Sequence, residues 1–136
     1  MANRLKVLLP LLVSPEQSGF VEGRKILDGI INAHEVIHSL KATKRPKMLI
    51  KLDLSKDYDK LSYNFMGKML KSFGFKDPWI RWIINLSSSD VFSILVNGTP
   101  TQPFKTSRGI RHGDSLSPFL FIVMDEGLGR MLTMTK

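Results

Sequence analysis

The chain has 136 residues and a mass of 15.4 kDa, which is the size of one domain. Hydrophobic residues make up 43% and charged residues 24%, so the composition disfavours global disorder. The 20 Lys and Arg outnumber the 12 Asp and Glu and give a formal charge of +8, which indicates an anionic partner, nucleic acid before a membrane surface. Because cysteine is absent, a disulfide scaffold, a thiolate metal site and a cysteine nucleophile are excluded.

The N-terminal segment resembles a targeting signal only in part. Its apolar stretch, residues 7–13, is interrupted by Pro10 and is far shorter than the roughly 18 to 20 residues of a membrane span. No small-residue cleavage site follows it, so the sequence disfavours a secretory signal. An organellar transit peptide, which the basic residues Arg4 and Lys6 would suit, is disfavoured to the same degree. We expect an intracellular chain without a membrane segment, whose compartment stays unknown.

Several segments have the apolar periodicity of helices. In residues 25–41 apolar side chains recur at alternating steps of four and three, which predicts a helix. Residues 61–73 keep a helical period up to Gly74, which is placed for a left-handed C-terminal cap. A further helix begins at once, with Asp77 as its N-cap and Pro78 in its first turn.

Two stretches predict strands. Residues 48–54 are short and apolar, and they lie between a basic loop and an acidic turn, which predicts a buried strand. Residues 91–96 are rich in β-branched side chains and lead into Asn97 and Gly98, a strong hairpin signal. The return strand, residues 101–106, is expected at an edge because Pro103 and the preceding Pro100 cannot donate to a ladder.

A last helix is expected over residues 119–131, with Ser117 as its N-cap and Pro118 in its first turn. With one more helix expected ahead of residue 25, the predicted order is helix, helix, strand, helix, helix, hairpin, helix. This is an α+β pattern, and it lacks the regular alternation of a doubly wound sheet.

Three aspartates, Asp53, Asp57 and Asp59, fall within seven residues where the predicted strand meets a helix. Carboxylate oxygens are the ligands that Mg²⁺ prefers, so one interpretation is a metal site for phosphoryl transfer. In the alternative, Asp57 and Asp59 line the first turn of the next helix, where the helix dipole favours negative charge, and Asp53 pairs with Lys56. Spacing alone favours the alternative.

Residues 108–118 form a loop with two glycines and two arginines that leads into the last helix. Glycine permits close approach of the backbone to a ligand, and Arg108 and Arg111 can pair with phosphate. His112 can act as an acid, a base or a donor near neutral pH. The alternative is an ordinary connection with solvated arginines and an exposed histidine. These residues alone favour neither the anion-binding loop nor the ordinary connection.

Three segments together match one family in order and spacing. They are residues 3–24, residues 51–59 around Asp53, and the stretch from Asn97 and Gly98 through residues 108–118. The chain thereby resembles the reverse transcriptase of plant non-LTR (LINE-type) retrotransposons over nearly all its length. The resemblance implies part of the fingers and palm of a right-hand polymerase, with fingers-side helices and the basic loop in residues 1–47 and the palm in residues 48–136.

The resemblance also implies roles for single residues. Asp53 takes the place of a catalytic, metal-binding aspartate for Mg²⁺, and Tyr58 that of the aromatic residue that floors the nucleotide pocket and screens the sugar 2′ position. His112 and Gly113 lie on the nucleotide side of the site. The partners implied are an RNA template, a DNA primer and deoxynucleotides, with phosphate contacts expected from basic side chains. These are Arg24, Lys44, Arg45, Lys47, Arg108 and Arg111.

The sequence departs from the family pattern in several places. His112 replaces a typical Gln, Ser115 a Pro and Asp57 a small Ala. The third family motif, with two adjacent aspartates, has no counterpart, and Asp125 with Glu126 lies inside the last predicted helix. We therefore expect a reverse transcriptase fragment with an incomplete palm sheet, inactive alone and separated from the remainder of a polymerase. The alternatives are a nucleic-acid-binding remnant without chemistry, an inert pseudogene product and an unrelated Mg²⁺-dependent phosphohydrolase.

Overall fold

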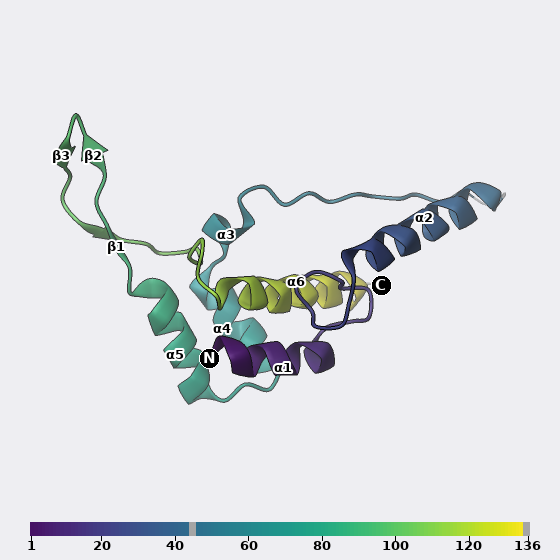
Figure 1. Cartoon of the computed structure of the whole chain (residues 1–136), viewed down its shortest axis with the longest axis horizontal. Helices are drawn as coiled ribbons and strands as arrows, with labels where there is room; N and C mark the ends of the chain where they lie inside the picture. The colour runs from purple at the N-terminus through teal and green to yellow at the C-terminus, as the bar shows by residue number, and fades with distance from the viewer. Residues whose placement is uncertain (44–45, 135–136) are drawn as a thin grey trace. The chain divides into compact units, whose positions relative to one another are not determined.

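The computed structural model describes residues 1–43 and 46–134 and is a mixture of helices and small sheets (Figure 1). The helices are α1 (Ala2–Leu12), α2 (Ile26–Ala42), α3 (Asp57–Lys60), α4 (Tyr63–Ser72), α5 (Asp77–Ser88) and α6 (Ser117–Met134). The strands are β1 (Val91–Phe92), β2 (Leu95–Val96), β3 (Thr99–Pro100) and β4 (Phe104–Lys105). β1 pairs with β4 and β2 with β3, both antiparallel. The expected α+β composition is confirmed.

The chain forms two compact units, one of Met1–Ser55 with Pro118–Lys136 and one of Lys56–Ser117. The functional division expected between residues 47 and 48 stays a prediction. Among the described residues, no helix is both long enough and apolar enough to cross a bilayer.

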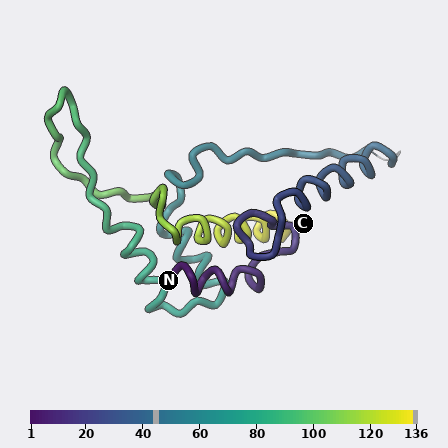
Figure 2. Tube along the Cα trace, in the orientation of Figure 1, coloured from purple at the N-terminus to yellow at the C-terminus, as the bar shows by residue number. Residues whose placement is uncertain are grey.

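In the first unit, α6 is joined to the chain that follows α1, which loops beside it (Figure 2). Glu126 accepts hydrogen bonds from the backbone N–H of Ser14 at 2.9 Å and from Arg130 Nε at 2.8 Å. Arg130 also donates to the carbonyl of Leu12 at 2.7 Å. Burial alone would raise the pKa of Glu126, but these hydrogen bonds and the charge of Arg130 outweigh it and lower the pKa. Glu126 therefore joins two segments of the first unit.

In the second unit, α4 and α5 pack against each other through apolar faces. The side chains buried on the two helices include Met66, Leu70, Ile80 and Ile83. A Cβ at Gly67 would lie 3.2 Å from the side chain of Ile84, so glycine permits this close approach. Gly74 has φ +84°, which confirms the left-handed end predicted after α4.

The start of α5 differs from the prediction in one residue. Lys76 is its N-cap and Asp77 is its first residue, so the prediction of Asp77 as the cap is wrong. The carboxylate of Asp77 instead lies 3.4 Å from Lys71 Nζ, in an exposed ion pair. Pro78 is in the first turn as expected, because its missing N–H costs nothing there.

The predicted hairpin is present, and its turn residues Asn97 and Gly98 both have positive φ, +51° and +80°. The return strand differs, since it starts at Thr99 and is interrupted between β3 and β4. Thr101 explains part of the interruption, because its hydroxyl and its backbone hydrogen-bond to Ile94 and Ser93 outside a regular ladder.

The predicted buried strand at residues 48–54 is absent, and this prediction is wrong. The segment is irregular and exposed, with 80% of Met48, 68% of Ile50 and 67% of Leu52 accessible (Figure 2). A strand needs a neighbour that satisfies its backbone groups, and none of the described segments pairs with this one. The helix predicted from residue 25 is confirmed as α2, although none of its residues is buried.

Candidate functional site

Two segments far apart in the sequence are joined within the second unit. The backbone N–H of Gly109 donates to the carbonyl of Leu61 at 2.8 Å, and that of Ile110 donates to the carbonyl of Tyr58 at 2.8 Å. These bonds attach the glycine-containing loop to the turn of α3. The loop predicted to bind anions therefore meets the segment that carries Tyr58.

Gly109 permits this junction by its conformation and by its size. Its φ of +98° is one that side chains rarely adopt. A Cβ there would lie 3.3 Å from the carbonyl oxygens of both Tyr58 and Asp59, which belong to backbone and cannot rotate away. The position therefore requires glycine for two separate reasons.

Replacing Gly109 with alanine is expected to destabilise the second unit by about 2–3 kcal/mol, of which about 1–2 comes from the positive φ. Gly74→Ala is the matched control, because Gly74 has φ +84° but nothing within 4 Å of its Cβ position. Urea unfolding of both variants measures the difference. An equal loss of unfolding free energy in both variants would show that the close carbonyl oxygens at Gly109 do not contribute to the effect.

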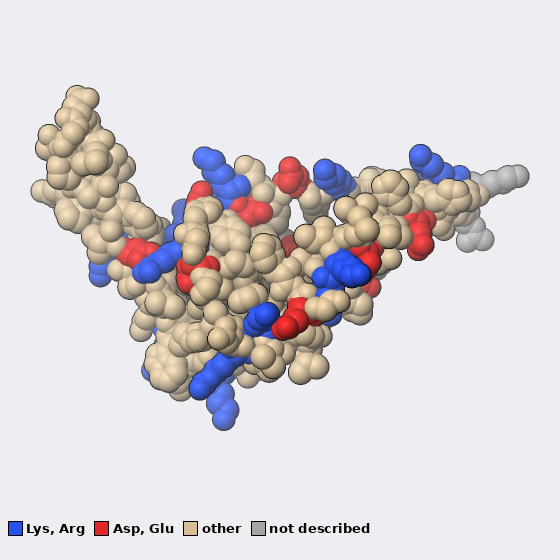
Figure 3. Space-filling view, in the orientation of Figure 1, with Lys and Arg blue, Asp and Glu red and all other residues tan. Residues whose placement is uncertain are grey.

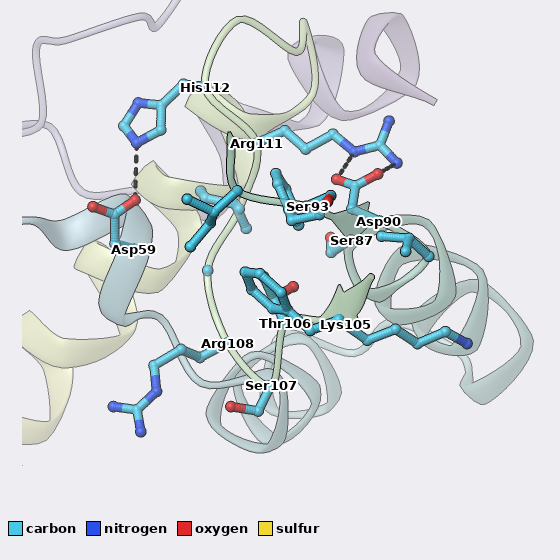
Figure 4. Close-up of a pocket in the computed structure, with 16 residues that line it drawn as sticks. Asp59, Ser87, Asp90, Ser93, Lys105, Thr106, Ser107, Arg108, Arg111 and His112 are labelled. Carbon is cyan, nitrogen blue, oxygen red and sulfur yellow. Dashed lines mark hydrogen bonds and ion pairs between the residues drawn. The ribbon is translucent and has the colours of Figure 1, made fainter. Parts of the chain in front are cut away.

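Tyr58 and His112 face each other across this junction. Their rings stack with centroids 5.2 Å apart and an interplanar angle of 24°. His112 Nε2 lies 3.0 Å from Asp59 Oδ1, in an exposed pair that Figure 4 shows as a dashed line. Burial raises the pKa of the Tyr58 hydroxyl. Two residues predicted for the nucleotide pocket are thus in contact, and Gly113 follows in the same loop.

The aspartates have separate environments. Asp53 belongs to the exposed, irregular segment and makes no hydrogen bond or ion pair with another described residue. Asp57 and Asp59 lie in the first turn of α3, as the structural alternative expected. Among the described residues, no group of three or more His, Asp or Glu could hold a metal ion. This donor set does not fit a two-metal site.

Two of the arginines predicted to contact phosphate are already engaged. Arg24 donates to the carbonyls of Ser14 and Gln17, the latter at 2.7 Å. Arg111 forms an ion pair with Asp90 through Nε and Nη2 (Figure 4). Its Nη2 also donates to Ser89 Oγ at 3.2 Å.

The other predicted phosphate contacts are exposed or outside the described residues. Arg108 is exposed and points away from the His112–Asp59 pair in Figure 4. Lys47 is exposed, whereas Lys44 and Arg45 lie outside the described residues. The sequence contained no signal for Asp90 as the partner of Arg111, because this pairing depends on where the end of α5 meets the loop.

The model of the family described as reverse transcriptase (RNA-dependent DNA polymerase) matches residues 1–135. The chain therefore belongs to the reverse transcriptase family, whose members use divalent metal ions and bind a nucleic-acid template and primer. The family predicted from the sequence motifs is confirmed.

Similar curated proteins come from transposable elements. The Transposon TX1 uncharacterized 149 kDa protein of Xenopus laevis is 26% identical over 118 residues, 87% of this chain and 9% of that protein. The Retrovirus-related Pol polyprotein from type-1 retrotransposable element R2 of Popillia japonica is 28% identical over 130 residues, which are 93% of this chain and 18% of that protein. The Retrovirus-related Pol polyprotein from type-2 retrotransposable element R2DM of Drosophila melanogaster is 29% identical over 112 residues, which are 82% of this chain and 11% of that protein.

The chain thus spans less than a fifth of the length of each of these relatives. The relatives are non-LTR retrotransposon proteins, as expected. They come from a frog and from insects, so the plant affiliation stays a prediction.

Proposed function

We propose that this chain is a segment of the RNA-directed DNA polymerase of a plant non-LTR retrotransposon, comprising the fingers side and an incomplete palm of a right-hand polymerase. The observation that carries the proposal is the junction in which Gly109 and Ile110 bond to the turn of α3 and Tyr58 stacks on His112. This junction unites the two motifs that the family places around the incoming nucleotide.

Each residue has a role in this proposal. Tyr58 floors the nucleotide pocket and screens the sugar 2′ position, while His112 and Gly113 lie against the nucleotide. Asp53 supplies one carboxylate for Mg²⁺. A bound divalent metal would supply activation of the primer hydroxyl and charge stabilisation of the triphosphate, which takes carboxylates from two motifs.

The 136-residue chain is inactive alone in this proposal, because its sequence holds no pair of adjacent aspartates. A second candidate function is nucleic-acid binding without chemistry, favoured by the formal charge of +8. Both candidate functions use the same basic side chains to bind nucleic acid. They differ in whether adding the motif with two adjacent aspartates restores polymerisation.

We expect the chain to bind RNA and DNA at low salt with little sequence preference. This binding tests the proposed phosphate contacts. The affinity should fall steeply with salt, because each neutralised phosphate releases counterions. Lys47→Gln and Arg108→Gln should each reduce the slope of log K against log salt by about 1. Arg111→Gln should reduce it less, because Asp90 already neutralises that guanidinium.

Fluorescence anisotropy with a labelled oligonucleotide, titrated at several salt concentrations, gives these slopes. Lys68→Gln, on the exposed surface of α4, is the matched control that removes an equal charge elsewhere in the second unit. Salt-independent binding, or equal slopes for all four variants, would count against the proposed surface.

A further inference from the structure

An open hollow of about 910 Å³ lies within the second unit, beside the base of the hairpin. It is lined by β1 and β4, by the end of α5 and by the loop from residue 106 to residue 112, as the close-up in Figure 4 shows. Its volume is in the range of sites that take ligands of several hundred daltons. The hollow is therefore large enough for one or two nucleotide bases.

Two aromatic rings line this hollow and remain accessible. Phe92 and Phe104 are directly opposite each other in the β1·β4 pair, with ring centroids 6.3 Å apart and planes tilted by 33°. The accessible fraction is 46% for Phe92 and 45% for Phe104. A pair that served only to pack against itself would not need to leave almost half of each side chain open, whereas a stacking surface does.

The charges around the hollow favour an anion. Of the two acids that line it, Asp90 forms an ion pair with Arg111, and Asp59 contacts His112, which balances its charge only when the imidazole is protonated. Lys105 and Arg108 also line it, are exposed and form no ion pair with a described residue. Figure 4 shows these two side chains extending outward from the rim in different directions. The hollow thus combines aromatic faces at its wall with uncompensated positive charge at its edge.

The rest of the hairpin carries no charge. Residues 91–104 contain no Lys, Arg, Asp or Glu, and the hairpin is uniformly tan in Figure 3. Of the residues that line the hollow, Lys105 and Arg108 carry the positive charge that no ion pair with a described residue compensates. This arrangement suits a chain whose phosphates contact Lys105 and Arg108 at the rim while its bases turn inward to the rings.

We propose that this hollow binds single-stranded nucleic acid, with one or two bases stacked on Phe92 and Phe104 and the adjoining phosphates held by Lys105 and Arg108. The proposal rests on the proposed function, since it names the form of nucleic acid that this part of the surface takes. Duplexes fit it poorly, because their bases are already stacked and offer no free face.

The test uses the full chain and labelled 12-mers of thymidylate and uridylate, with a 12-base-pair duplex for comparison. Phe92→Leu, which keeps an apolar side chain but removes the ring, should weaken single-strand binding by about tenfold, as the loss of one stacked base does. Phe92→Tyr should bind within about twofold of wild type, and duplex binding should change by less than about twofold in both variants.

Leu95→Ala is the matched control, because Leu95 is an exposed hairpin residue outside the hollow. Where Phe92→Leu fails to fold, Phe92→Trp gives the answer, since its added indole emission should be quenched by the single strand. Unquenched emission, or Phe92→Leu binding as well as wild type, would overturn the stacking site and leave the proposed function intact. A wild-type chain that binds no nucleic acid would overturn both.

Discussion

Primer extension by the purified 136-residue chain is expected to be undetectable on an RNA template with Mg²⁺ or Mn²⁺. Polymerisation by two metals requires carboxylates from two motifs, and the sequence supplies Asp53 without a pair of adjacent aspartates. Removing part of such an electrostatic clamp costs several kcal/mol, or orders of magnitude in rate. A gel assay of labelled primer measures this directly.

The Asp53→Ala variant is the control for this assay, because a contaminating polymerase would be unaffected by it. Templated incorporation that is present in the wild-type chain and disappears with Asp53→Ala would contradict the expectation.

Extending the chain with the third family motif, which carries the two adjacent aspartates, is expected to raise the unfolding midpoint by about 10 °C and to improve solubility. Residues 48–54 are exposed and pair with none of the described segments, and open backbone groups of this kind invite association with other chains. Burying two of their apolar side chains contributes about 3–6 kcal/mol, and each kcal/mol raises the midpoint of such a chain by roughly 3 °C. Calorimetry of the two chains measures the shift.

A second extended chain, with both adjacent aspartates changed to asparagine, separates pairing of the backbone from metal binding. It should be stabilised as much as the first. A 136-residue chain that is monomeric and unfolds cooperatively above about 65 °C would instead show that these residues need no further partner.

Elements that depend on local chemistry were predicted well from the sequence. The helix predicted over residues 25–41 is Ile26–Ala42, because a stripe of apolar residues at helical spacing is a local property. The turn at Asn97 and Gly98 is likewise determined by residues that tolerate positive φ. Pro118 is in the first turn of α6 as expected, although Ser117 is the first residue of the helix and not its N-cap.

Elements that depend on partners were not predictable in the same way. The apolar run 48–54 has the composition of a buried strand, but no described segment satisfies its backbone, so it stays irregular. The predicted phosphate contacts of the arginines also depended on partners that the sequence does not reveal. Arg24 and Arg111 are of the type that binds phosphate, yet nearby carbonyls and Asp90 already occupy them.

The site was predictable as a set of residues but not as an arrangement. The motifs identified Tyr58 and His112 separately, and their stacking follows from Gly109, whose missing side chain lets two backbone segments meet. His112 contacts Asp59, an aspartate that the metal interpretation groups with Asp53. Asp53, to which the resemblance assigns the metal, makes no such contact among the described residues, and neither does the buried Oδ1 of Asp57.

The most direct test of the account is primer extension by the chain joined to the third family motif, comparing Asp53→Asn with Asp59→Asn. The two changes remove the same charge six residues apart, but Asp59 lies 3.0 Å from His112 while Asp53 has no such partner among the described residues. We expect the joined chain to extend the primer, Asp53→Asn to lower the rate by about 10³-fold or more, and Asp59→Asn to lower it by less than about tenfold. A joined chain that polymerises equally well with Asp53→Asn would contradict the assignment of Asp53 as the metal-binding aspartate of a reverse transcriptase segment.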